Sequence, residues 1–212
     1  MNIREAKEIL GGDISNKNSK MNGYTFGISP FHCKTGNKLS AIEGTSCSKC
    51  YAQKIAKLRP NVAQAWLKRV KIINSLYTDS QWDNWVKAFN TLLSKRNVKQ
   101  FRWHDSGDLQ SLEHYSSIIR IAKDNPDISF WLPTKETNIV NSYTGEVPSN
   151  LVVRLSTPKI DSRPIKFINT STVHKTKEHY GFKCVAPEQG NKCGSCNACY
   201  NKEVANVSYK LH

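Results

Sequence analysis

Seven cysteines, divided into two groups, are the residues of this sequence best suited to chemistry. The groups comprise Cys33, Cys47 and Cys50, and then Cys184, Cys193, Cys196 and Cys199. Four thiolates complete the ligand shell of a structural zinc ion or an iron–sulfur cluster, whereas three leave one iron of a four-iron cluster open to a substrate or cofactor. The division therefore predicts a cysteine-bound metal centre with one or two 4Fe–4S clusters.

The second group has the spacing C-x2-C-x2-C over residues 193–199, which is the start of the bacterial ferredoxin pattern. Cys184 is the expected fourth ligand. Three ligands within seven residues surround a cubane more easily than a single tetrahedral ion, so the spacing favours iron–sulfur over the zinc alternative. The sequence leaves open whether there are two centres or one shared centre, in which Cys47 and Cys50 meet two of the later cysteines.

The first group contains CSKCYA (47–52), followed by a basic segment with helical character. Two thiolates three residues apart can bind one metal centre from a single turn, and the amino end of a following helix stabilises their negative charge. Cys33 follows a predicted strand and is the expected third ligand. The alternative is that Cys33 is a core residue and that the CxxC pair forms half of a zinc site, with His32 as another possible ligand.

Composition predicts one folded domain in the cytoplasm. The 212 residues include 38% hydrophobic residues, and no apolar run approaches the roughly 18 residues that cross a bilayer. Cytosolic thiols stay reduced, which favours metal binding over disulfides. The net charge of +14 favours a polyanion such as nucleic acid as a partner, and no membrane association is expected.

Periodicity predicts an α/β chain. Apolar residues at helical spacing predict helices over residues 60–77, 80–94 and 112–123, with Ser80 as the cap of the second and Asp108 or Ser111 as the cap of the third. Short apolar strands are expected at 24–30, 100–109, 128–136, 150–158 and 164–172. Strands that end in polar residues and alternate with helices are typical of parallel sheets. We therefore expect an abbreviated or partial (β/α) barrel, TIM-barrel-like, spanning residues 1–212 as a single domain with a cysteine-rich segment at 184–199.

Polar residues at the predicted strand ends are the further site candidates. The cofactor-binding candidates are Asp105, Ser106, Asp108, Arg154 and Ser156, and the catalytic candidates are Asp105, Lys135 and Glu136. A lysine can neutralise a carboxylate or phosphate, and a glutamate can act as an acid or base. A charge within an apolar strand, as in LVVRLST, must be paired or face a polar cavity. The alternatives are a capping role for Asp108 and a surface ion pair between Lys135 and Glu136.

A predicted strand, a cysteine loop ending in CxxCYA and a helix together resemble the opening of radical S-adenosylmethionine enzymes, particularly the branch that includes spore photoproduct lyase. The resemblance implies S-adenosylmethionine as a cofactor, with its amino group held by Asp105, Ser106 and Asp108. The chain departs from the CxxxCxxC pattern of that superfamily, because thirteen residues separate Cys33 from Cys47.

A closer similarity is to the phage-encoded gene product eighty-eight family. It is carried by CSKCYA (47–52), by RWHDSGDL (102–109) with FWLPTKE (130–136), and by the cysteine-rich tail. This similarity implies a viral origin, hence the host cytoplasm, and a cysteine-bound metal centre, but no settled activity.

Two hypotheses follow from the sequence. The first is an iron–sulfur enzyme on a radical-enzyme-like (β/α) barrel that uses S-adenosylmethionine on a substrate still to be identified. The second is a non-catalytic iron–sulfur or zinc protein that binds nucleic acid or a host factor through its basic surface.

Overall fold

A computed structural model of the protein describes residues 1–15, 20–21, 23–175 and 178–211. Its centre is a seven-stranded sheet in the order β1-β2-β3-β4-β5-β7-β6, and every pair of neighbouring strands runs parallel. The strands are β1 (Tyr24–Phe26), β2 (Gln100–Trp103), β3 (Ser129–Thr134), β4 (Leu151–Ser156), β5 (Thr170–His174), β6 (Phe182–Lys183) and β7 (Asn206–Lys210). The predicted parallel α/β class is therefore confirmed.

The sheet is open, with β1 and β6 at its two edges. The first five strands lie in chain order, as successive strand–helix units predict, and only β6 and β7 exchange places. Closure into a partial barrel stays a prediction. None of the helices in the described ranges is long and apolar enough to cross a membrane.

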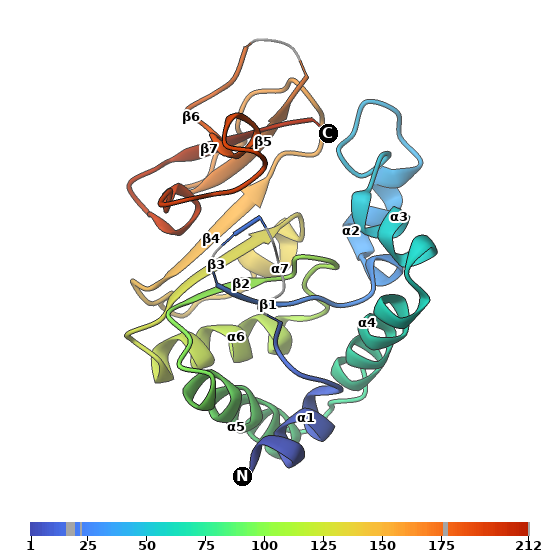
Figure 1. Cartoon of the computed structure of the whole chain (residues 1–212), viewed down its shortest axis with the longest axis vertical. Coiled ribbons are helices and arrows are strands. Elements are labelled where there is room, and N and C mark those ends of the chain that lie inside the picture. Colours follow the sequence, from blue (N-terminus) through green and yellow to red (C-terminus); the bar gives the residue numbers. More distant parts are fainter. Residues whose placement is uncertain (16–19, 22, 176–177, 212) are drawn as a thin grey trace.

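Helices cover one face of the sheet and one of its edges (Figure 1). The α-helices are α1 (Ile3–Leu10), α2 (Lys34–Ser40), α3 (Tyr51–Leu58), α4 (Pro60–Ile73), α5 (Asp79–Lys95), α6 (Leu112–Asp124) and α7 (Thr137–Asn141), and the 3-10 helices are η1 (Pro30–His32), η2 (Ala186–Glu188) and η3 (Ala198–Tyr200). Helices α1, α5 and α6 pack beneath the central strands, whereas α2, α3 and α4 lie beside the β1 edge (Figure 1).

Alternate residues of the central strands divide the sheet into two different faces. On the helical face, Phe101 and Trp103 of β2 are fully buried, and Trp103 packs against Phe89 of α5 with ring centroids 4.8 Å apart. On the opposite face, Arg102 of β2 lies 4.5 Å over the ring of Trp131 of β3. The segment around η3 packs on this second face, where Tyr200 contacts Trp131, so this part of the cysteine-rich tail packs on strands instead of a helix.

The element boundaries differ from the predictions in a few places. Helix α5 begins one residue earlier than expected, and its cap is Thr78, which forms a capping box with Gln81, so the prediction of Ser80 as the cap was wrong. The cap of α6 is Ser111, whose hydroxyl accepts a hydrogen bond from the His114 N–H, so Asp108 does not cap this helix. The strand expected at 164–172 lies at Thr170–His174 instead.

Candidate metal centre

The three cysteines of the first group lie beyond the carboxyl ends of the first strands. Cys33 follows β1 through η1 and is the residue before α2, and Cys50 is the residue before α3, with Cys47 in the turn that precedes it. Because the strands are parallel, the residues that follow β2, β3 and β4 reach the same edge. We call Cys33, Cys47 and Cys50 the front cysteines.

A glycine leaves space between two of these thiols. The Sγ atoms of Cys33 and Cys47 each lie 3.7 Å from the position that a Cβ on Gly36 would occupy, and the Cβ of Cys33 lies 2.9 Å from it. Burial raises the pKa of Cys33 well above its usual range, and the charges of Asp108, Cys50 and Cys47 raise it further. The front cysteines therefore converge in a partly buried, anion-rich site.

Asp108 ties the ends of β2 and β3 together at this site. Its Oδ1 accepts hydrogen bonds from Thr134 Oγ1 at 2.5 Å and from the Leu109 N–H at 2.8 Å, and its Oδ2 accepts one from the Lys135 N–H at 2.9 Å. Burial raises the pKa of Asp108 to about 6, and these hydrogen bonds oppose the rise. Asp108 thus holds the backbone that presents Lys135.

Lys135 supplies the positive charge beside the front cysteines. Its Nζ donates to the Thr157 carbonyl at 3.2 Å, beyond the end of β4. Burial lowers the pKa of Lys135, and the charge of Cys47, followed by those of Asp108, Cys50 and Cys33, opposes that change. This ammonium group can offset the negative charge of thiolate ligands.

Glu136 fastens α2 to the end of β3. Its two carboxylate oxygens accept hydrogen bonds from the Thr35 N–H at 2.8 Å and from Thr35 Oγ1 at 2.7 Å. The side chain is buried, and among the described ion pairs it has none with Lys135. The alternative of an exposed Lys135–Glu136 ion pair was therefore wrong, and Glu136 fixes the residues next to Cys33.

Asp105 and Ser106 point toward β1 instead. Asp105 Oδ2 accepts a hydrogen bond from Thr25 Oγ1 at 3.1 Å, while its Oδ1 is buried without a partner. Ser106 Oγ donates to the Ile28 carbonyl at 3.0 Å. The Tyr51 hydroxyl donates to the Asp105 carbonyl, which links this strand end to the residue after Cys50.

We call the four cysteines of the second group the tail cysteines. They lie in the irregular chain around η2 and η3, between β6 and β7. Burial raises the pKa of Cys193, and the charges of Cys184 and Cys196 raise it further, which places these three thiols near one another. Cys199 is more deeply buried, and its Sγ is 3.1 Å from the Tyr209 hydroxyl. Burial raises the pKa of Cys199 to about 11.

Arg154 holds the tail against β4. It is fully buried, and its guanidinium donates five hydrogen bonds to main-chain carbonyls at 2.8–3.3 Å. The acceptors are the carbonyls of Thr170, Ala198, Cys199, Asn201 and Val204. Ser156, two residues along β4, exchanges a hydrogen bond with Ser171 at 2.9 Å. Both side chains are engaged within the protein, and a cofactor role for either stays a prediction.

Comparison with known proteins assigns the family. Residues 3–202 match the profile described as Gene product 88. The chain belongs to the Gene product 88 family. It is also similar to the Gene 88 protein of Mycobacterium phage L5, with 22% identity over 79% of this chain and 80% of that protein. No solved structure matches the chain.

This assignment confirms the predicted phage gene-product family. Similarity to a mycobacteriophage protein agrees with the viral origin that the sequence motifs imply. The comparisons do not support the resemblance to radical S-adenosylmethionine enzymes, which remains a prediction from the CxxCYA element alone.

The described side chains of this Gene product 88 family member form no ready-made site for a single metal ion. Within the described residues, no three His, Cys, Asp or Glu side chains are arranged to hold a single metal ion. Zinc requires its ligands at about 2.3 Å from one centre, whereas the thiolates around a four-iron cubane lie further apart.

Two supporting residues of the site have no clear signal in the sequence. Thr35 and Gly36 lie two and three residues after Cys33 in KTGNK (34–38), a sequence typical of a polar loop or helix start. Gly36 leaves space beside Cys47, and Thr35 donates hydrogen bonds to Glu136, and both partners are distant in the chain. Only the position of the glycine one turn after a cysteine could have suggested a close approach.

Proposed function

We propose that this protein binds an iron–sulfur cluster through Cys33, Cys47 and Cys50. The observation that carries the proposal is the approach of the Cys33 and Cys47 thiols to the space left by Gly36, with Cys50 close enough to influence Cys33 electrostatically, beyond the carboxyl ends of a parallel sheet. Three protein thiolates leave one iron of a four-iron cluster available to a further ligand. The ligand that we propose is S-adenosylmethionine, so the protein would be an enzyme whose substrate is not yet identified.

The surrounding residues have separate tasks in this proposal. Lys135 offsets the charge of the thiolates, and Asp108 fixes the backbone on which Lys135 lies. Glu136 positions α2, and thereby Cys33, through Thr35. Asp105 points toward β1 but has one buried carboxylate oxygen without a partner, so we propose it as an acceptor for a cofactor that extends to the end of β2.

The tail cysteines would hold a second cluster. Cys184, Cys193 and Cys196 influence one another electrostatically, as neighbouring thiols do. Cys199 would be the fourth ligand, and the Tyr209 hydroxyl could donate a hydrogen bond to its sulfur.

Iron and sulfide analysis of anaerobically purified protein, with electron paramagnetic resonance of the reduced sample, tests the proposal. About four irons per chain are expected for one cluster and about eight for two. Cys33→Ser should remove the front cluster and leave the tail spectrum, and Cys184→Ser should do the reverse. A colourless protein that contains zinc would end the iron–sulfur proposal.

Equilibrium dialysis with radiolabelled S-adenosylmethionine tests the enzymatic part separately. Binding should require the iron-loaded protein and should be lost in Cys33→Ser but kept in Cys184→Ser. A loaded protein that binds no S-adenosylmethionine would retain the cluster proposal and remove the radical-enzyme hypothesis.

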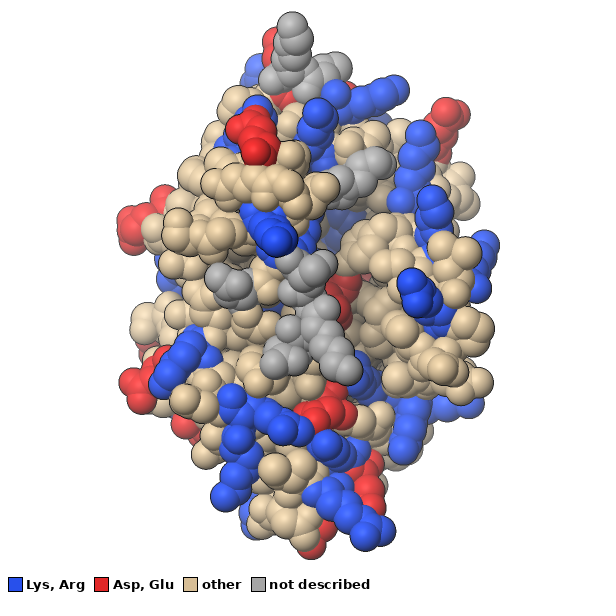
Figure 2. Space-filling model, in the orientation of Figure 1, with Lys and Arg blue, Asp and Glu red and all other residues tan. Residues whose placement is uncertain are grey.

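A second candidate function is supported by the charge of α2, α3 and α4. Residues 34–71 contain nine basic residues and one acidic residue, Glu43. The basic residues are Lys34, Lys38, Lys49, Lys54, Lys57, Arg59, Lys68, Arg69 and Lys71. Arg69 is buried, and Lys and Arg side chains are numerous along the side of the molecule that carries these helices (Figure 2). We propose that this surface binds a polyanion such as nucleic acid.

Fluorescence anisotropy with labelled DNA and RNA, measured at several salt concentrations, tests this candidate. Affinity should fall steeply as salt rises, because each neutralised phosphate releases counterions. The double variant Lys54→Glu/Lys57→Glu on α3 should weaken binding and flatten the salt dependence, whereas Lys87→Glu/Lys123→Glu on α5 and α6 is the matched control. Equal effects of the two variants would contradict a defined surface.

A further inference from the structure

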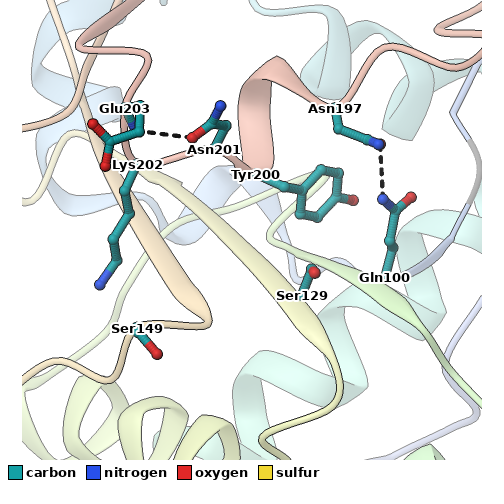
Figure 3. Close-up of a pocket in the computed structure, with 8 residues that line it drawn as sticks. All are labelled: Gln100, Ser129, Ser149, Asn197, Tyr200, Asn201, Lys202 and Glu203. Carbon is teal, nitrogen blue, oxygen red and sulfur yellow. Dashed lines mark hydrogen bonds between the residues drawn. The ribbon is translucent and has the colours of Figure 1, made fainter.

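A polar pocket lies at the amino ends of the strands, whereas the front cysteines lie beyond the carboxyl ends. It has a volume of about 550 Å³ and is lined by the starts of β2 and β3, by the turn before β4, and by the tail around η3. Its lining residues are Gln100, Ser129, Ser149, Asn197, Tyr200, Asn201, Lys202 and Glu203 (Figure 3). The volume is in the range of pockets that bind small organic molecules.

The tail wall of the pocket is held rigidly. Arg154 donates to the carbonyls of Ala198, Cys199 and Asn201, which flank Tyr200. Asn169 Nδ2 donates to the Lys202 carbonyl at 2.7 Å. Because buried side chains of β4 and the loop before β5 fix this wall, a ligand would not have to order it on binding.

Two carboxamides on one wall present a donor beside an acceptor. Gln100 Nε2 donates to Asn197 Oδ1 at 2.8 Å, which joins the start of β2 to the tail. That pairing leaves Gln100 Oε1 as an acceptor and Asn197 Nδ2 as a donor, and neither has another partner among the described residues. A planar heterocycle with a donor next to an acceptor matches this pair.

A buried hydroxyl in the same wall lacks a partner. Tyr200 Oη is inaccessible to solvent and makes no hydrogen bond, and in Figure 3 it points toward the amides of Gln100 and Asn197. An unpaired buried hydroxyl is destabilising unless a water or ligand pairs with it. Its position adds a third hydrogen-bonding group to the donor and acceptor of the amide pair.

The charges of the pocket favour a ligand without a formal charge. One cation and one anion line it, and the cation is already engaged, because Lys202 Nζ donates to the Pro148 carbonyl at 2.9 Å. A phosphate would find no concentration of positive charge here. Amide side chains recognise the polar edges of nucleobases by paired hydrogen bonds.

We infer that this pocket binds the nucleobase of a nucleoside or of an unpaired nucleotide. The inference is independent of the front cysteines, because none of them lines the pocket, whereas Asn197 and Tyr200 directly adjoin the tail cysteines Cys196 and Cys199. It also differs from the polyanion surface on α2, α3 and α4, because the contacts are to a neutral base and not to phosphates.

Saturation-transfer NMR and isothermal titration with the four ribonucleosides, in high salt, test the inference. At least one nucleoside should bind, and free ribose should not. Tyr200→Phe, which removes only the hydroxyl, should weaken binding about fivefold, as expected for one hydrogen bond, and Gln100→Leu should weaken it about tenfold or more. Tyr77→Phe is the matched control, because Tyr77 is 83% exposed and lies outside the pocket.

Circular dichroism of each variant separates a lost contact from a lost fold. Repeating the titration with a short single-stranded oligonucleotide distinguishes a base within a strand from a free nucleoside. Absence of saturable binding by every nucleoside and oligonucleotide, or equal binding by wild type, Tyr200→Phe and Gln100→Leu, would overturn the inference. Binding of ribose equal to that of the nucleosides would also overturn it.

Discussion

The front and tail cysteines lie in the same fold but are positioned by different physical means. The front cysteines follow regular strands, and carboxylates at the ends of β2 and β3 hold the neighbouring backbone. The tail cysteines lie in irregular chain that is held to β4 mainly by one buried guanidinium. The comparison shows that the regular sheet edge distributes its support over several side chains, whereas the irregular tail concentrates five of its hydrogen bonds on one.

Removal of that anchor should have the largest effect on stability. Arg154→Met deletes five hydrogen bonds and leaves buried carbonyls unpaired, so the free energy of unfolding should fall by about 3–5 kcal/mol. Urea unfolding measures the loss. Arg120→Met, which breaks an exposed ion pair with Asp83, should cost at most about 1 kcal/mol. Similar losses in the two variants would show that the tail has other support.

Acid should destabilise the region beneath the front cysteines. His104 and His114 are buried beside each other, with ring centroids 5.2 Å apart. Burial, together with the charge of Arg102, lowers the pKa of His104 from 6.5 to about 3, and burial also lowers the pKa of His114. The unfolded chain binds more protons than the folded chain in this window, so stability is lost as pH falls below about 6.5.

The expected slope is about 1.4 kcal/mol per pH unit for each histidine between pH 6 and pH 4. Asp108 acts in the opposite direction, because its pKa is raised to about 6. Urea unfolding of wild type and His114→Phe at several pH values isolates the histidine contribution. The pH dependence of stability in the variant should be shallower by about 1.4 kcal/mol per pH unit, the contribution of one histidine. Parallel pH profiles would contradict the assignment.

Loss of the Thr35 hydroxyl, which holds α2 to Glu136, should lower stability more than loss of a hydroxyl on an exposed helix face. Thr35→Val removes the hydrogen bond to Glu136 Oε2 without changing the shape of the side chain, and should cost about 1–2 kcal/mol because the acceptor is charged and buried. Alkylation of Cys33 should become faster, while that of Cys193 should not change. The control is Thr91→Val, whose hydroxyl bonds the Lys87 carbonyl on the exposed face of α5.

Filling the space at Gly36 should have the smallest effect on stability, and its effect on iron loading should be confined to the front site. Gly36 lies within α2, where alanine ordinarily stabilises a helix by up to about 1 kcal/mol. Here the new Cβ would approach the Cys33 Cβ to 2.9 Å, so we expect Gly36→Ala to lower stability by about 1 kcal/mol and to impair iron loading of the front site alone. Lys38→Ala in the same helix is the control. A stabilised Gly36→Ala variant with full iron content would show that the thiols do not need this space.

The parts of the site that follow from strand order could be predicted from the sequence. Asp108, Lys135 and Glu136 each follow an apolar strand, and parallel pairing alone brings them to one edge. The strand that ends the chain could not be predicted, because NVSYK (206–210) is short and its partner β6 has only two residues. The partners of Arg154 are also hidden in the sequence, since main-chain carbonyls are the same for every residue type.

The hydrogen bonds of Arg154 also have a consequence for synthesis on the ribosome. All five acceptors lie between residues 170 and 204, so none of them is outside the exit tunnel when β4 first leaves it. A buried guanidinium without partners is strongly unfavourable, and the sheet therefore cannot close over it until the last fifth of the chain has emerged. The nascent protein must wait in an incomplete state, in which its thiols are open to the cell's cluster-delivery or oxidising chemistry before the fold encloses them.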